Sequence, residues 1–140
     1  MLRIELHDWS HARVAASRIR LAVFVQEQRV PPEIELDEKD ATSVHALAYD
    51  GGTAVGTGRL LPDGHIGRMA VLKANRARGV GGAILARLIE EARHRGMREV
   101  VLSAQTHALE FYRKHGFAAH GAAYMEAGIP HQEMRLRLLP

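Results

Sequence analysis

Residues 76–85 read RARGVGGAIL, so two arginines and three glycines stand directly before a helical pattern. The first amides of a helix have no internal partners and carry partial positive charge, and glycines let an anion approach them closely. The segment therefore predicts a phosphate site built from the backbone amides that open a helix over residues 80–95. Gly96 stands where that helix should end, and its apolar stripe is Ile84, Leu85, Leu88, Ile89 and Ala92.

Two known nucleotide-binding motifs do not fit this segment. A P-loop needs a lysine after its last glycine, and no lysine follows these glycines. A dinucleotide fingerprint counted from Gly79 and Gly81 ends on Ile84 instead of glycine. Such a fingerprint should also open the first strand–helix unit of a parallel doubly wound sheet, whereas this segment follows a hairpin. The pattern that remains is Arg76-x-x-Gly79-x-Gly81.

The rest of the sequence predicts a mixed sheet around this helix. Alternating or continuous apolar runs predict strands at residues 2–6, 44–50, 53–61, 65–72, 98–104, 117–124 and 132–138. Helical spacing predicts helices at residues 10–25, with Ser10 as the N-cap, and at 80–95 and 107–115. The order is roughly β-α-β-β-β-α-β-α-β-β, an α/β fold that we expect to form a single domain over residues 1–140.

Composition excludes several kinds of site. The chain has 140 residues and no cysteine, which excludes disulfides, thiolate metal sites and a cysteine nucleophile. Among nine histidines, His7 and His11 straddle a helix start without a third ligand, so no metal is expected. The N-terminus lacks a signal-peptide pattern and no stretch reaches membrane-spanning length, so we expect a cytoplasmic protein without membrane contact.

Charge is unevenly distributed along the chain. Residues 73–99 carry seven basic side chains against three acidic ones, which suits an anion. Residues 33–40 form an acidic stretch that could attract a cationic amine. Its five acidic residues are Glu33, Glu35, Asp37, Glu38 and Asp40. For either segment the alternative is a solvated surface.

Four segments of the chain, residues 76–81, 105–117, 23–40 and 124–131, together resemble the GCN5-related N-acetyltransferase (GNAT) superfamily. The Arg76-x-x-Gly79-x-Gly81 pattern after the strand IGRMAV is similar to its acetyl-CoA motif. Residues 105–117, QTHALEFYRKHGF, are similar to its later motif, in which a tyrosine precedes a Gly-Phe pair. Residues 23–40 and 124–131, VFVQEQRVPPEIELDEKD and YMEAGIPH, resemble the ElaA-like branch. The resemblance spans most of the chain and implies a mostly antiparallel central sheet flanked by helices.

The resemblance also implies direct transfer of an acetyl group from acetyl-CoA to a primary amine, without a covalent enzyme intermediate. Met69, Ala70 and Val71 would offer backbone groups to the pantetheine arm, and Gln105, where many members carry Asn, is a further cofactor contact. The side chains of Arg76 or Arg78 could add charge-assisted hydrogen bonds. The residues whose N–H groups would hold the diphosphate are Arg76, Ala77, Arg78, Gly79, Val80, Gly81 and Gly82.

The acceptor amine needs a base, because an alkylamine with a pKa near 10.4 is mostly protonated at neutral pH. Glu27 is the first candidate, since partial burial beside Val25 and Val30 would raise its pKa. His131 is the rival because its ordinary pKa near 6.5 already suits a base. Both residues would also contact the acceptor. Glu126 is less favoured, and water stays an alternative to all three.

The departing CoA thiolate needs a proton, and the resemblance assigns the general acid to Tyr112. A tyrosine with pKa about 10 donates to a thiolate of pKa about 8.5 at a cost of about 2 kcal/mol, which is tolerable if the tyrosine's pKa is lowered or if a hydrogen bond to sulfur suffices. The alternative for Tyr112 is a core aromatic beside Phe111.

Two other functions compete with the enzyme. A non-catalytic acyl-CoA sensor would keep the phosphate site and lose the chemistry. A basic nucleic-acid-binding module would fit the sequence pI near 9.7, but no such motif is present and aromatic residues are few. We therefore expect a small-molecule or peptide amine as the partner and no nucleic acid. A homodimer is suggested by analogy alone.

Overall fold

The computed structural model describes residues 1–32 and 37–139 and contains one seven-stranded sheet. The strands lie in the order β1-β2-β3-β4-β5-β7-β6, and every neighbouring pair is antiparallel except β4 and β5. The predicted mixed, mostly antiparallel sheet is therefore confirmed. The bounds are β1 (Leu2–His7), β2 (Val44–Asp50), β3 (Thr53–Leu60), β4 (His65–Val71), β5 (Glu99–Gln105), β6 (Ala118–Glu126) and β7 (Ile129–Arg137).

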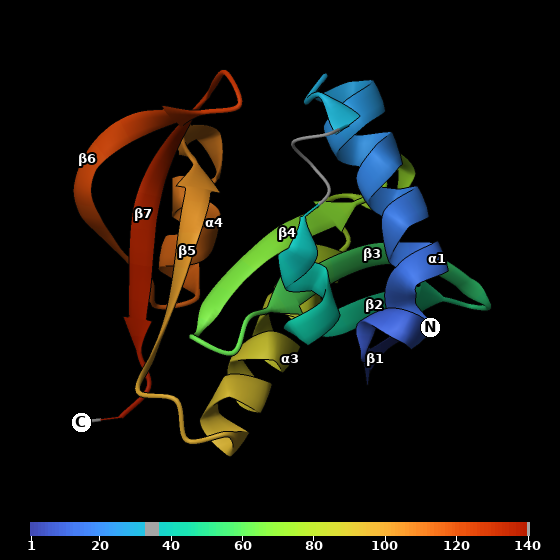
Figure 1. Cartoon of the computed structure of the whole chain (residues 1–140), viewed down its shortest axis with the longest axis horizontal. Helices are drawn as coiled ribbons and strands as arrows, with labels where there is room; N and C mark the ends of the chain where they lie inside the picture. The colour runs from blue at the N-terminus through green and yellow to red at the C-terminus, as the bar shows by residue number, and fades with distance from the viewer. Residues whose placement is uncertain (33–36, 140) are drawn as a thin grey trace.

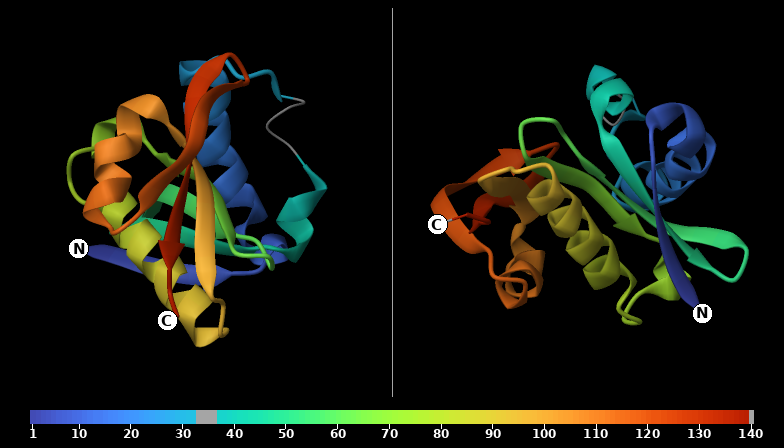
Figure 2. Two further views of the ribbon diagram at one scale, coloured as in Figure 1. Left: turned by 90° about the vertical axis from the view of Figure 1, so that its left-hand side faces the viewer. Right: turned by 90° about the horizontal axis from the view of Figure 1, so that it is seen from below.

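Helices cover both faces of this sheet. Figure 2 shows α1 (Trp9–Arg20) on one face and α3 (Val80–His94) with α4 (Leu109–Lys114) on the other. The predicted order of helices and strands holds along the whole described chain. The short turns between the main elements are η1 (Leu21–Glu27), η2 (Glu38–Thr42), η3 (Lys73–Asn75) and η4 (Thr106–Ala108).

The main core lies between α3 and the sheet. The predicted apolar stripe of α3 is buried there: Ile84, Leu85, Leu88, Ile89 and Ala92. The helix approaches β3 closely because β3 carries glycine where it crosses the helix. A Cβ added at Gly58 would lie 2.9 Å from Cγ2 of Ile84, too close for a side chain. The position of α3 therefore depends on glycine in the strand beneath it as well as on its own stripe.

The first helix differs from its prediction at both ends. Asp8, not Ser10, is the N-cap, because its carboxylate accepts from the His11 amide at 3.1 Å, and the Ser10 hydroxyl donates to the same carboxylate. After Arg20 the helix widens into the π-helical turn η1, in which the Gln28 amide donates to the Val23 carbonyl. This wider turn extends the helical segment to Glu27, two residues past the predicted end.

The sheet divides between β4 and β5, as Figure 1 shows. The two strands pair in parallel only at His65↔Val101 and Ile66↔Leu102 and then diverge. The β3–β4 register shifts over the same stretch of β4, where Arg68 has a left-handed φ of 48°. Such a bulge bends and twists its strand, so β4 turns away from β5 towards its C-terminal end.

Among the described residues, no helix is both long and apolar enough to cross a membrane.

Candidate active site

The start of α3 presents free backbone amides, as the glycine segment predicts. The first helical hydrogen bond runs from the Ala83 amide to the Gly79 carbonyl at 3.0 Å. Within the described part of the chain, the amides of Val80, Gly81 and Gly82 have no hydrogen-bond partner, and no side chain caps the helix. Because such amides favour a negatively charged ligand, this helix start can hold a phosphate group.

The backbone directly before α3 makes a tight turn and leaves open space beside Gly79. Ala77 and Gly79 both adopt left-handed φ angles, 64° and 79°. A Cβ added at Gly79 would meet no atom within 4 Å, so an anion has room beside it. A Cβ at Gly81 would instead contact the Phe111 ring at 3.6 Å. Of these two glycines, Gly79 therefore lies beside open space and Gly81 faces the packed helix α4.

The arginines of this segment lie differently from one another. The Arg76 guanidinium donates to both carboxylate oxygens of Glu27, at 2.5 and 2.6 Å, and its Nε donates to the Val71 carbonyl at 3.0 Å. The exposed Arg78 makes no ion pair with any residue that the structure describes. The Arg78 guanidinium therefore has no partner among the described residues, whereas that of Arg76 already has three acceptor contacts.

The Glu27 carboxylate is held as an anion, contrary to the expected upward shift of its pKa. Its side chain is 37% exposed, so burial is slight. The hydrogen bonds from Arg76 lower its pKa, and they outweigh the opposing effect of desolvation. A carboxylate with a lowered pKa is a weak base. The prediction that partial burial raises the pKa of Glu27 and so suits it as the general base is therefore wrong, because its pKa is lowered.

The residue after Glu27 connects η1 to the other half of the sheet. The Gln28 side-chain carbonyl accepts from the side-chain amide of Gln105 at 2.9 Å. The side-chain oxygen of Gln105 also lies 2.7 Å from Nε2 of His107. Gln105 ends β5 and lies opposite His131 of β7. The structure thus links Glu27, Arg76, Gln105 and His131 through neighbouring contacts across the point where β4 and β5 diverge.

His131 is buried and has a defined ring orientation. Its Nδ1 lies 2.6 Å from the Ile129 carbonyl, and because a carbonyl only accepts, Nδ1 must carry a proton. Its Nε2 lies 3.5 Å from a carboxylate oxygen of Glu126, and its ring stacks on Tyr124. In the neutral ring Nε2 is therefore the nitrogen that can accept a proton, with a carboxylate beside it.

Tyr112 is largely a packed residue. Its ring contacts Phe111 and Phe117 edge to face, at centroid distances of 5.0 and 6.0 Å. Burial raises its pKa to about 12, the opposite of the lowering considered for an acid. Full proton transfer to a thiolate with pKa about 8.5 would then cost about 5 kcal/mol. The hydroxyl, which has no hydrogen-bond partner among the described residues, can still donate a hydrogen bond.

The three residues expected to line the pantetheine arm end β4, on the diverging edge. Ala70 is buried and pairs with Thr57, whereas Met69 and Val71 are half-buried. The Val71 carbonyl accepts from Arg76, as described above. Met69–Val71 and the α3 start therefore adjoin one another, joined by the loop that contains η3.

Of the three acidic residues of this stretch that the structure describes, Asp37 and Asp40 are paired with arginines, whereas Glu38 is exposed and has no ion pair with a described residue. Asp40 is 4% exposed and accepts from Arg20 and Arg59 at 2.9 Å. Asp37 accepts from Arg59 and from Arg68 at 2.7 to 3.1 Å, which lowers its pKa to about 2. The hypothesis that these aspartates attract a cationic amine is contradicted, because arginines already neutralise them. Glu33 and Glu35 lie outside the described residues.

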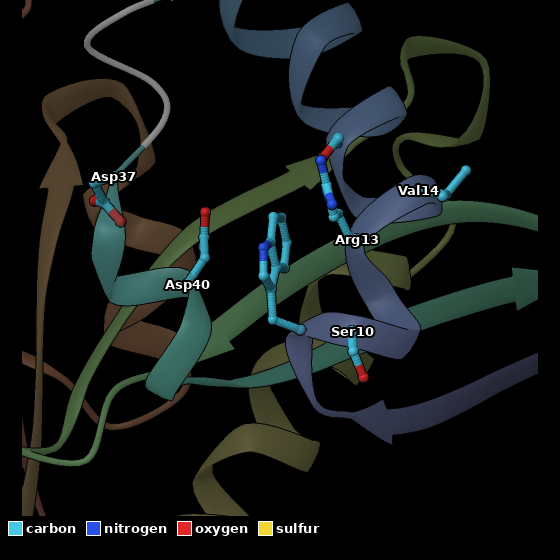
Figure 3. A pocket seen from close by; sticks show the side chains of 7 residues that line it. Ser10, Arg13, Val14, Asp37 and Asp40 are labelled. Atoms are coloured by element: carbon cyan, nitrogen blue, oxygen red, sulfur yellow. The ribbon is translucent and has the colours of Figure 1, made fainter.

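A hollow beside this acidic stretch does not coincide with the α3 start. It has a volume of about 710 Å³ and lies between the N-terminal half of α1 and η2, as Figure 3 shows. Asp37 and Asp40 line one side and are engaged by the arginines named above. The α3 start is the better candidate site, because its free amides provide a specific ligand chemistry. The other lining residues are Trp9, Ser10, Arg13, Val14 and Ser17.

His7 and His11 each have an acidic neighbour of their own. His7 contacts Glu5 at 2.9 Å, and His11 contacts Asp8 at 2.6 Å. In the described residues, no three histidine, aspartate or glutamate side chains gather as a metal ion would require.

Two features of this site were not predicted. The first is the contact of Gln28 with Gln105, for which the neighbouring polar residues at the end of a helix are a visible signal. The second is the closeness of Phe111 in α4, and of His115 just after it, to the α3 start, where a Cβ added at Gly81 or Gly82 would lie 3.6 or 3.4 Å from them; it carries no signal in the sequence. Both depend on residues far apart along the chain.

Comparison with known proteins agrees with this fold. The family model described as "Acetyltransferase (GNAT) domain" matches residues 10–138. The chain is 43% identical over 120 residues to YjcF of Bacillus subtilis (strain 168), described as an uncharacterized N-acetyltransferase; the match covers 83% of this chain and 86% of YjcF. It is 32% identical over 142 residues to protein ElaA of Escherichia coli (strain K12), covering 91% of this chain and 93% of ElaA.

Solved structures give the same result. The crystal structure of Escherichia coli ElaA matches with a TM-score of 0.87 at 30% identity and covers 98% of this chain and 100% of that one. An acyl-CoA N-acyltransferase from Pseudomonas aeruginosa matches with a TM-score of 0.87 at 30% identity, covering 97% and 99%. With the strand order, the diverging strands and the free amides of α3, these matches show that the chain belongs to the GNAT family of N-acetyltransferases.

Proposed function

We propose that the chain, acting as one catalytic domain over residues 1–140, transfers the acetyl group of acetyl-CoA to a primary amine. The observation that carries this proposal is that the amides of Val80, Gly81 and Gly82, at the start of α3, have no partner among the described residues. They would hold the diphosphate, with room for it beside Gly79. When bound, acetyl-CoA supplies the acetyl group as a thioester, which a neutral amine attacks to form an amide and free CoA thiol.

His131 is the group that we propose as the base. Its Nδ1 proton is held by the Ile129 carbonyl, so the neutral ring can accept the amine proton at Nε2. The Glu126 carboxylate 3.5 Å from Nε2 would stabilise the resulting imidazolium. Glu27 is disfavoured, since Arg76 occupies both of its oxygens.

Tyr112 would act on the leaving group through a hydrogen bond. With a pKa raised to about 12, its hydroxyl stays protonated throughout the neutral range. A neutral donor can stabilise developing charge on the departing sulfur without giving up its proton. The thiolate, whose pKa is about 8.5, could then take its proton from water.

The phosphate assignment is tested by comparing CoA with pantetheine, which lacks the diphosphate. In ¹H–¹⁵N spectra, CoA should shift the amide signals of Val80, Gly81 and Gly82, and pantetheine at the same concentration should not. Equal shifts with both compounds, or no uptake of CoA in calorimetry, would remove the basis of the proposal.

Catalysis is tested by measuring thiol release from acetyl-CoA with a panel of amines. Turnover with a primary amine supports the enzyme. CoA binding without turnover of any amine would instead identify an acyl-CoA sensor. The base is tested separately by His131→Gln, which should lower kcat at least about 10-fold. It should also remove the acid limb of the pH profile, that is, the fall of kcat/KM at low pH.

A further inference from the structure

The ion pair between Glu27 and Arg76 joins the loop before α3, residues 76–79, to the end of η1. It is bidentate, at 2.5 and 2.6 Å, between residues 49 positions apart. We propose that Glu27 is a positioning residue, which fixes the loop carrying the α3 amides by holding Arg76. This inference rests on the proposed function, because it assumes that those amides bind the diphosphate.

Arg76 is suited to this role because its guanidinium makes three directed contacts. Two nitrogens donate to Glu27 at the end of η1, and Nε donates to the Val71 carbonyl at the end of β4. A planar guanidinium paired with a carboxylate through two parallel hydrogen bonds fixes orientation as well as distance. The residue that opens the loop is thereby tied to two separate elements.

The loop itself has few other constraints. Within the described residues, its backbone bonds are a long contact from the Arg76 amide to the Lys73 carbonyl at 3.4 Å and the first helical bond, from the Ala83 amide to the Gly79 carbonyl. Ala77 has a left-handed φ of 64°, which costs about 1–2 kcal/mol for a residue with a side chain. Residues 77–79 are exposed, so packing does not supply the missing restraint.

The end of η1 supports both halves of the divided sheet. Glu27 reaches Arg76 beyond β4, and the adjacent Gln28 reaches Gln105 at the end of β5 at 2.9 Å. Consecutive residues on a helix point in different directions, so these two side chains can engage opposite halves. Glu27 is accordingly part of a support for the site.

The test is a comparison of Glu27→Gln with wild type by calorimetry with CoA and by thiol-release kinetics. We expect Kd for CoA to rise about 5-fold, the upper end for a half-exposed ion pair. The kcat at saturating acetyl-CoA and its pH profile should stay unchanged. Glu5→Gln is the matched control, because Glu5 is 35% exposed and pairs with Arg3 at 2.7 Å on β1. It should leave Kd unchanged.

A double-mutant cycle shows whether Glu27 acts through Arg76. If it does, Glu27→Gln should have no further effect on Kd in an Arg76→Gln background. Thermal melting confirms that each variant is folded. An equal effect in both backgrounds, or an unchanged Kd with a lost kcat and acid limb, would overturn the inference and make Glu27 a catalytic group. A wild-type protein that takes up no CoA would refute the proposed function before any variant is compared.

Discussion

Asp40 provides the clearest quantitative prediction, because it is a buried carboxylate between two guanidinium groups. Its side chain is 4% exposed and accepts from Arg20 at 2.9 and 3.1 Å and from Arg59 at 2.9 Å. Its backbone carbonyl also accepts from His45 at 2.9 Å. Through these contacts it joins α1 and β3 to the segment that precedes β2.

Asp40→Ala should destabilise the protein by about 3 kcal/mol. Breaking a buried ion pair by removing one partner typically costs about 3–5 kcal/mol, because a charge is left uncompensated. We take the lower end of that range, since Arg59 keeps its two contacts with Asp37 at 2.7 and 2.9 Å. With a denaturant slope of about 2 kcal/mol per molar urea, the unfolding midpoint should fall by about 1.5 M.

The assay is urea unfolding followed by circular dichroism, with Asp63→Ala as the control. Asp63 is 63% exposed and pairs with His65 at 3.0 Å, so its loss should change stability by less than about 0.5 kcal/mol. KM for the amine should be the same in Asp40→Ala and wild type wherever the variant is folded. A loss of stability below about 1 kcal/mol, or a raised amine KM at full stability, would refute the reasoning.

Three further predictions each concern a single residue. Tyr112→Phe should lower kcat in the thiol-release assay about 10-fold or more, the value of a hydrogen bond to developing charge, without changing CoA affinity; an unaltered kcat would make Tyr112 a packing residue. Burial lowers the pKa of His45 below 6.5, so its contribution to stability is present above pH 6.5 and is lost as the pH falls, because the unfolded chain binds the proton more readily. The urea midpoint should therefore drop between pH 7.5 and 5.5, and drop less in His45→Gln. Gly64→Ala should cost at least about 1 kcal/mol, because Gly64 has φ 96° and an added Cβ would lie 2.8 Å from the Glu99 carbonyl. Gly52→Ala, with no atom within 4 Å of the added Cβ, should be nearly neutral; equal costs for the two glycines would contradict this account.

Much of the fold could be predicted from local patterns. The strands Val44–Asp50 and Thr53–Leu60 and the helix Val80–His94 begin at their predicted residues. These elements have strong periodicity bounded by turn residues, and such signals depend only on neighbours in the chain. The N-cap of α1 lies two residues before the predicted one, because Asp8 and Ser10 are both good caps and only the hydrogen bonds distinguish them.

The candidate site was predictable in part. Gly79, Gly81 and Gly82 predict a helix start with accessible amides, and the structure contains one. The protonation chemistry was not predictable in the same way. A carboxylate's pKa depends on which charges lie within a few ångströms, and the partner of Glu27 is 49 residues away in the sequence.

The sequence by itself determined the order of elements, the apolar face of α3 and the free amides at its start, because each follows from residues within about two turns of one another. Only the tertiary structure decided that Glu27 is tied to Arg76 and that Asp37 and Asp40 are neutralised by arginines. It also decided that burial raises the pKa of Tyr112. Electrostatic interactions act through space, and their strength depends on distance and burial, which exist only once the chain has folded.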